Sequence, residues 1–158
     1  MSTLNKQPIF TATPILVSET FDPYRYTANL YDVYSYADEP SGRFVFSATD
    51  IHGTLIERIT ITTCASNDYP NISERYVYMF LHSPGANIRW NLYKTAYIAA
   101  DTISYPKLNP VIEWVFEGGL LLPNEAQIAF GASENVDHSG YQGDYLSVTI
   151  EGSSYTQP

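Results

Sequence analysis

The spacing of apolar residues is the feature that most constrains the fold, because several segments place an apolar residue at every second position. In Ile112–Phe116 the isoleucine, the tryptophan and the phenylalanine share one face, and Leu146–Ile150 repeats the pattern. A period of two fits a β-strand with one buried face, whereas a helix needs a period of about 3.6 residues. Thr, Tyr, Ile, Val and Phe, which favour strands, fill these segments. The pattern predicts an all-β protein.

The other candidate strands complete an antiparallel β-sandwich. They are residues 8–17, 24–34, 44–49, 58–62, 76–81, 88–92 and 126–132. Tyr76–Leu81 is apolar on both faces, which indicates a central strand or one whose second face meets another subunit. Pro84 and Gly85 suit the centre of a type II turn and predict a hairpin that leads into Ile88–Leu92. About eight or nine short strands predict a sandwich of the jelly-roll kind, although the sequence leaves the strand order open.

Length and charge limit the domain count and the partners. The 158 residues fit a single domain, with residues 1–17 as an extended N-terminal arm or edge strand and residues 18–158 as the β-sandwich. Eight Lys and Arg residues face 17 Asp and Glu residues, which gives a net charge of −9. This charge predicts that the protein binds neither nucleic acid nor an anionic membrane.

Cysteine usage and hydropathy indicate the compartment. Cys64 is the single cysteine, so no intrachain disulfide can form. The first 17 residues contain no apolar run of the signal-peptide type, and no stretch of about 18 apolar residues occurs. We expect a protein without a signal peptide that is made in the cytosol.

Residues that could carry catalysis or bind a metal do not converge in the sequence. The three histidines are far apart in the sequence, so they do not suggest a metal site. In Asp137–Ser139 an aspartate, a histidine and a serine are consecutive, and consecutive residues cannot adopt the geometry of a catalytic triad. Gly118–Gly119 lacks the frame of a phosphate-binding loop and predicts a bend or bulge between strands. We predict no catalytic residue, no metal, no cofactor and no enzymatic activity. A small hydrolase that uses Glu113 and Glu117 stays open as a third alternative.

Tyrosine is the most informative surface signal, because the chain has 14 of them and several crowd near residues 24–36. Tyrosine is enriched at protein interfaces and suits sugar-binding surfaces, because its ring is large and amphipathic. The candidate interface residues are Ile9, Phe10, Ile15, Tyr24, Tyr26, Tyr31, Tyr34, Tyr76 and Tyr78. A candidate glycan-binding loop contains Asn67, Asp68, Tyr69 and Asn71.

Three segments occur in order along the chain. Gly53–Ile61 has a Gly-Thr opening and an amphipathic strand, Arg75–Leu92 has a strand–tight turn–strand hairpin, and Ile112–Gly152 includes the step Leu120–Pro123. In this order they resemble a family of small phage-encoded β-sandwich virion proteins. From Gly53 to Tyr155, the region that holds them spans roughly two thirds of the chain. The family often closes with Gly-Gly-Asp-Tyr, whereas this chain reads Gly-Ser-Ser-Tyr at Gly152–Tyr155.

The resemblance implies a non-enzymatic virion protein, made in the host cytoplasm, that is commonly trimeric. It implies a capsid decoration or head-fibre component whose partners are copies of itself and the major capsid protein or other virion proteins. Residues 1–17 would then reach a neighbour as an arm. The alternative is a carbohydrate-binding or receptor-binding module of a phage tail or fibre, with a host surface glycan as its partner.

Overall fold

The computed structural model describes residues 11–21, 44–64, 71–72, 74–84, 90–102, 111–133 and 145–156. Most of these residues lie in strands, and none lies in a helix. The strands are β1 (Thr11–Phe21), β2 (Phe44–Ser47), β3 (Thr54–Cys64), β4 (Asn71–Ile72), β5 (Arg75–His82), β6 (Trp90–Ile98), β7 (Asp101–Thr102), β8 (Val111–Leu122), β9 (Gln127–Ala132) and β10 (Tyr145–Thr156).

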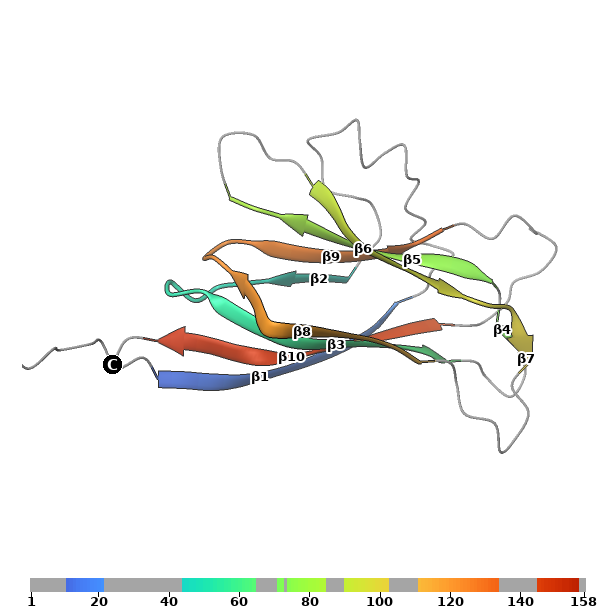
Figure 1. Cartoon of the computed structure of the whole chain (residues 1–158), viewed down its shortest axis with the longest axis horizontal. Coiled ribbons are helices and arrows are strands. Elements are labelled where there is room, and N and C mark those ends of the chain that lie inside the picture. The colour runs from blue at the N-terminus through green and yellow to red at the C-terminus, as the bar shows by residue number, and fades with distance from the viewer. Residues whose placement is uncertain are drawn as a thin grey trace, which may run out of the picture.

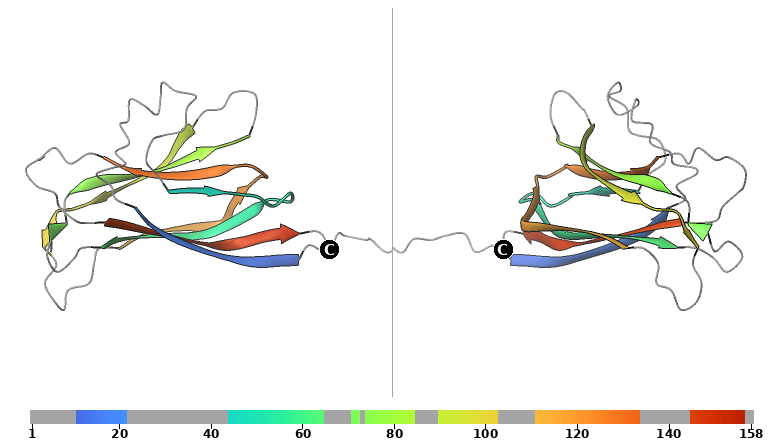
Figure 2. Two further views of the ribbon diagram at one scale, coloured as in Figure 1. Left: turned by 180° about the vertical axis from the view of Figure 1, so that it is seen from behind. Right: turned by 45° about the vertical axis from the view of Figure 1, so that its right-hand side comes forward.

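Two four-stranded sheets face each other as the layers of a β-sandwich (Figures 1 and 2). The first sheet has the order β1-β10-β3-β8, and the second has the order β2-β9-β5-β6. The short strands β4 and β7 pair with each other. Every strand pair is antiparallel. The predicted fold class, an all-β antiparallel sandwich, is therefore confirmed.

The strand order is that of a jelly roll. The eight long strands pair from the outside of the chain inward, β1 with β10, β2 with β9, β3 with β8 and β5 with β6. Successive pairs belong to opposite sheets, and the pairs β10·β3 and β9·β5 complete the two sheets. A chain that folds as one long hairpin and then wraps around itself produces this order, which closes two Greek keys.

The core lies between the sheets, and the period-two positions fill it. Ile59, Trp114 and Val148 of the first sheet belong to the same buried cluster as Met79 and Phe130 of the second. Burying one such side chain contributes about 1.5–3 kcal/mol relative to leaving it in water. The alternation that predicts each strand therefore also selects the face that it buries.

β5 has a second buried face, which points away from the first sheet. Tyr78 and Phe80 form a separate buried cluster there with Trp90 of β6 and Ala129 of β9. β5 pairs with β9 on one side and with β6 on the other, so the predicted central strand is confirmed. The chain itself buries the inner face of β5 and, at Tyr78 and Phe80, its outer face, whereas Tyr76 stays exposed.

The boundaries of several predicted elements differ in detail. Residues 11–17, expected as an arm or an edge strand, belong to β1, which lies at the edge of the first sheet and continues to Phe21. The predicted hairpin is confirmed by the β5·β6 pairing. Gly85, needed for its type II turn, and the predicted strand 24–34 lie outside the described residues. The described part of the chain contains no helix with the length and apolar character needed to cross a membrane.

Candidate functional site

The predicted interface residues fall into two groups. Ile15 is partly buried in β1 and packs against the core, and Tyr76 and Tyr78 lie on the outer face of β5. Tyr78 is only 5% exposed. Ile9, Phe10, Tyr24, Tyr26, Tyr31 and Tyr34 lie outside the described residues.

The predicted glycan loop can be placed only at its end. Asn71 begins the short strand β4, and its partner in the register is Thr102 of β7. Asn67, Asp68 and Tyr69 lie outside the described residues. The loop therefore stays a prediction.

Tyr76, Tyr78 and Tyr97 form a tyrosine ladder on the outer face of the second sheet. Tyr76 is the cross-strand partner of Tyr97, and the two ring centroids are 5.2 Å apart with a tilt of 51°. The rings of Tyr76 and Tyr78 are nearly parallel, with centroids 6.5 Å apart. The Tyr97 hydroxyl donates a hydrogen bond of 2.9 Å to the Glu74 carboxylate, and this bond raises the pKa of Tyr97. Tyr97 therefore holds its proton as a donor to Glu74.

Ser133 fixes the other side of the ladder. Its hydroxyl accepts a hydrogen bond of 2.8 Å from the Tyr76 backbone N–H, and its own N–H donates one of 2.8 Å to the Tyr76 carbonyl. Burial raises the pKa of Tyr78, a neighbouring Tyr76 adds to the rise, and a hydrogen bond with Ser133 lowers it in part. The ladder is thus held by Glu74, which precedes β5, and by Ser133, which follows β9.

The outer face of the first sheet carries exposed apolar side chains that the sequence analysis did not single out. Leu16 of β1 is 73% exposed, and Leu121 of β8 is 62% exposed. The register aligns Leu16, Glu151, Arg58 and Val115 in one row across the four strands, and it pairs Leu55 with Leu121 at the end of the sheet. We call Leu16, Leu55, Val115 and Leu121 the outer patch.

A bulge interrupts the sheet beside this patch. On β3, Arg58 pairs with Val115 and Ile56 pairs with Leu120, so residues 116–119 of β8 lie opposite Glu57 alone. Gly118 and Gly119 have φ angles of 76° and 79°, which an L side chain rarely adopts. As predicted, the two glycines bend the strand, and Figure 1 shows β8 turning toward the second sheet near its end.

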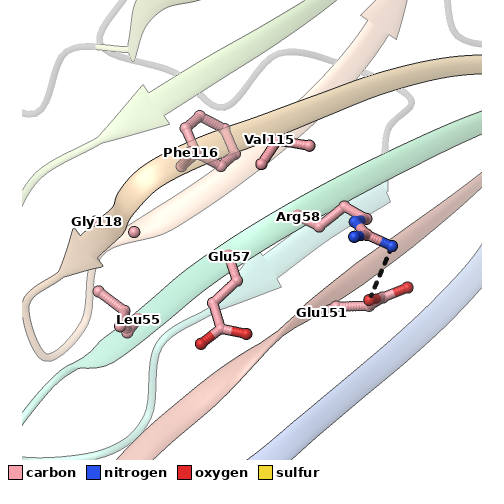
Figure 3. Close-up of a pocket in the computed structure, with 8 residues that line it drawn as sticks. Leu55, Glu57, Arg58, Val115, Phe116, Gly118 and Glu151 are labelled. Atoms are coloured by element: carbon pink, nitrogen blue, oxygen red, sulfur yellow. Dashed lines mark ion pairs between the residues drawn. The ribbon is translucent and has the colours of Figure 1, made fainter.

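The bulge leaves a cavity of about 420 Å³ on the outer face, and its lining combines apolar and charged groups (Figure 3). Leu55 and Val115 contribute the apolar side chains of the outer face, whereas Phe116, which also lines the cavity, stacks its ring on Tyr93 of β6. Glu57, Arg58 and Glu151 contribute the charged groups, and in Figure 3 the guanidinium of Arg58 reaches toward Glu151. A hollow that combines apolar and charged groups can accept an apolar side chain and orient a polar group next to it.

The charged groups leave this surface acidic. Arg58 Nε lies 3.4 Å from Glu113 Oε1, and Arg58 Nη1 lies 3.9 Å from Glu151 Oε2. All three side chains are about half exposed, and such pairs contribute about 0–1 kcal/mol each. Glu57 lines the same cavity, so this surface carries three carboxylates and one guanidinium and attracts a positively charged group more than a negative one.

The sequence carries signals for this site. Ile56 and Ile59 are three residues apart and both fully buried, so the period of two breaks at Glu57 and Arg58, which are both exposed. This break marks the bulge. Val115 shares the solvent face of Glu113, which is the unusual position for an apolar residue on a sandwich strand.

The described segments show where the residues considered for metal binding and for hydrolysis lie. Within them, no three His, Cys, Asp or Glu side chains form a group that could hold a metal ion. Glu113, considered above as a hydrolase acid, is bound to Arg58 on the open face of the sheet. Glu117 is exposed in the bulge region of the same strand and does not line the cavity.

Comparisons with known proteins give little further information. No protein-family model matches the chain, and no curated protein matches it. Among solved structures, a chain described under "Crystal structure of the T13 IBDV viral particle reveals a missing link in icosahedral viruses evolution" is similar, with 12% sequence identity and a TM-score of 0.35. The match covers 99% of this chain and 40% of that chain. A likeness at this TM-score carries no argument about function.

Proposed function

We propose that this chain is a virion structural protein that acts by protein–protein assembly, as a trimeric decoration or fibre component on the outside of a phage capsid. The outer patch with its cavity is the observation that carries the proposal. Exposed apolar side chains beside a hollow are typical of surfaces that meet another protein. The jelly roll is compatible with this role, because it is frequent in viral capsid domains, although lectins and cupins use it too.

The chemistry of the cavity describes its partner. The carboxylates of Glu57, Glu113 and Glu151, which outnumber the one guanidinium on this surface, favour a segment that carries Lys or Arg beside an apolar side chain. Residues 1–10 of this chain have that composition, with Lys6, Ile9 and Phe10 and no Asp or Glu. We assign the cavity to this segment of a neighbouring copy. A contact between an arm and a different surface of the next copy is heterologous, and such contacts form a ring where the rotation between copies closes; a trimer is one such ring.

The sheet geometry supports this assignment. β1 begins at Thr11, and its residue Pro14 lies in the row Pro14–Ser153–Leu55–Leu121. β1 therefore begins at the end of the sheet that carries Leu55 and the cavity. In the proposed trimer, this end of each copy binds the arm of one neighbour and donates its own arm to the other neighbour.

Val115→Glu is expected to weaken the trimer by at least about tenfold in its dissociation constant, because it puts a carboxylate into the apolar lining of an acidic cavity. Light scattering on the protein as it elutes from a size-exclusion column measures the mass of the assembly, to which each copy contributes 17.8 kDa. Val111→Glu is the matched control. Val111 is a valine on the same face of β8, and it is 57% exposed against 56% for Val115. It lies at the far end of the strand, so the trimer should persist.

Deletion of residues 1–10 is expected to give the monomer mass, because it removes the proposed occupant of the cavity. The sandwich itself should remain folded, with the circular dichroism of the full chain. A full-length protein that stays monomeric at about 0.1 mM and does not bind capsids contradicts the proposed function. A trimer that survives the deletion leaves assembly intact and contradicts only the assignment of the arm.

A further inference from the structure

The exposed end of the tyrosine ladder lies on the opposite side of the sandwich from the outer patch. Tyr76 is 49% exposed and Tyr97 is 52% exposed, although both belong to a sheet whose outer face is otherwise largely buried. The planes of the two rings are tilted by 51° relative to each other, so the rings present two adjoining surfaces. We call these two residues the tyrosine platform.

The platform is held in place before any ligand arrives. Tyr76 rests against the buried Tyr78, which in turn contacts Phe80 with ring centroids 6.1 Å apart. Tyr97 is fixed through its hydroxyl to Glu74. Side chains that are already ordered lose little conformational entropy when they bind, so even a weak stacking contact can give measurable affinity.

We propose that the tyrosine platform binds a neutral saccharide. The C–H groups of a pyranose ring present an apolar face that fits the face of an aromatic ring, and its hydroxyls need hydrogen-bond partners at the ring's edge. Glu74 supplies carboxylate oxygens beside the platform, and the Tyr97 phenol oxygen can accept a further hydrogen bond.

The local charge selects among sugars. Glu74 is exposed beside Tyr97, and the chain has a net charge of −9. A uronate or another acidic sugar is therefore repelled, whereas a neutral hexose or N-acetylhexosamine is not. This site differs from the loop predicted from the sequence around Asn67, and the two assignments are independent of each other.

The site also goes beyond the assembly function. The outer faces of the two sheets point in opposite directions, so a copy attached through the outer patch presents the tyrosine platform away from that attachment (Figures 1 and 2). The two surfaces can be occupied together. A failure of saccharide binding leaves the assembly proposal intact, and the reverse also holds.

In the test, the full-length protein is titrated with cellohexaose, chitohexaose and maltohexaose as neutral probes. Backbone amide NMR shifts report the binding. At least one probe is expected to shift the amides of Tyr76 and Tyr97 with a dissociation constant on the order of 1 mM. An oligogalacturonate of the same length is the acidic probe, and it should bind at least about tenfold more weakly.

Matched variants separate stacking from a general effect on the fold. Tyr76→Ala should weaken binding at least about tenfold, whereas Tyr97→Phe keeps the ring and should lose only a few-fold. Tyr145→Ala is the control, because Tyr145 is also about half exposed (44%) but lies on β10 of the other sheet. The proposal is overturned if no neutral probe shifts the platform at about 20 mM, or if Tyr145→Ala costs as much as Tyr76→Ala. Preferential binding of the acidic probe or of a proline-rich peptide overturns it as well.

Discussion

Alanine in place of Gly152 is expected to lower the free energy of unfolding by about 3 kcal/mol, because the added methyl group has no room. A Cβ atom at this position would overlap the carbonyl oxygen of Leu55 and come within 3.0 Å of the Ile56 Cα. Both are backbone atoms of the neighbouring strand β3, which cannot turn aside as a side chain can. Relief requires a shift of the β10·β3 pairing at its bulge.

Urea unfolding followed by circular dichroism measures this effect, and Gly118→Ala is its control. Gly118 has a positive φ, so alanine costs about 1 kcal/mol there, but nothing lies within 4 Å of the added Cβ. The difference between the two variants reports the clash itself. Equal unfolding midpoints for both variants would show that β3 and β10 do not approach each other closely at Gly152.

The close approach at Gly152 also explains why the cavity exists where it does. The β10·β3 register shifts between Glu151 and Gly152, and the β3·β8 register shifts between Ile56 and Arg58. Glu57 has no partner in either register, so β3 is distorted at the same residue toward both of its neighbouring strands. This double distortion turns Glu57 and Arg58 to the same face and opens the hollow beside Leu55. A regular sheet would present a continuous surface of side chains here.

The sequence predicts which residues form strands better than it predicts which strands pair with each other. Alternation at Ile112–Phe116 and Leu146–Ile150 identifies which face is buried, because the side-chain period of a strand is two. It does not identify the partner strand, since β10 pairs with β3 across 80 or more residues of chain, as in the pair of Tyr145 with Cys64. The jelly-roll order therefore follows from the structure, where the pairs nest from β1·β10 inward.

The candidate sites show the same limit. Tyr76 is visible in the sequence as a tyrosine in a strongly apolar strand, but its partner Tyr97 becomes significant only through the β5·β6 register. The outer patch likewise joins β1, β3 and β8, so no single segment reveals it. What a single segment does reveal is the break between Ile56 and Ile59, which marks the bulge.

Phe80→Ala is expected to cost about 3–5 kcal/mol of unfolding free energy, as much as the loss of a phenylalanine from the core between the sheets. Phe80 is 1% exposed, yet it lies on the face of β5 that points away from the first sheet. Phe130→Ala removes the same side chain from the inter-sheet core, where Phe130 is fully buried, and is the matched control. Chemical unfolding of both variants gives the comparison.

The outcome distinguishes the two interpretations of a strand that is apolar on both faces. If the chain itself covers the outer face of β5, both variants lose similar free energy, and the loss does not depend on protein concentration. If another subunit covers that face, Phe80→Ala costs much less than Phe130→Ala in the dilute monomer, because the removed side chain was in contact with water there. A small cost for Phe80→Ala, about 1 kcal/mol or less, would therefore contradict the buried second cluster and move the assembly surface from the first sheet to the second.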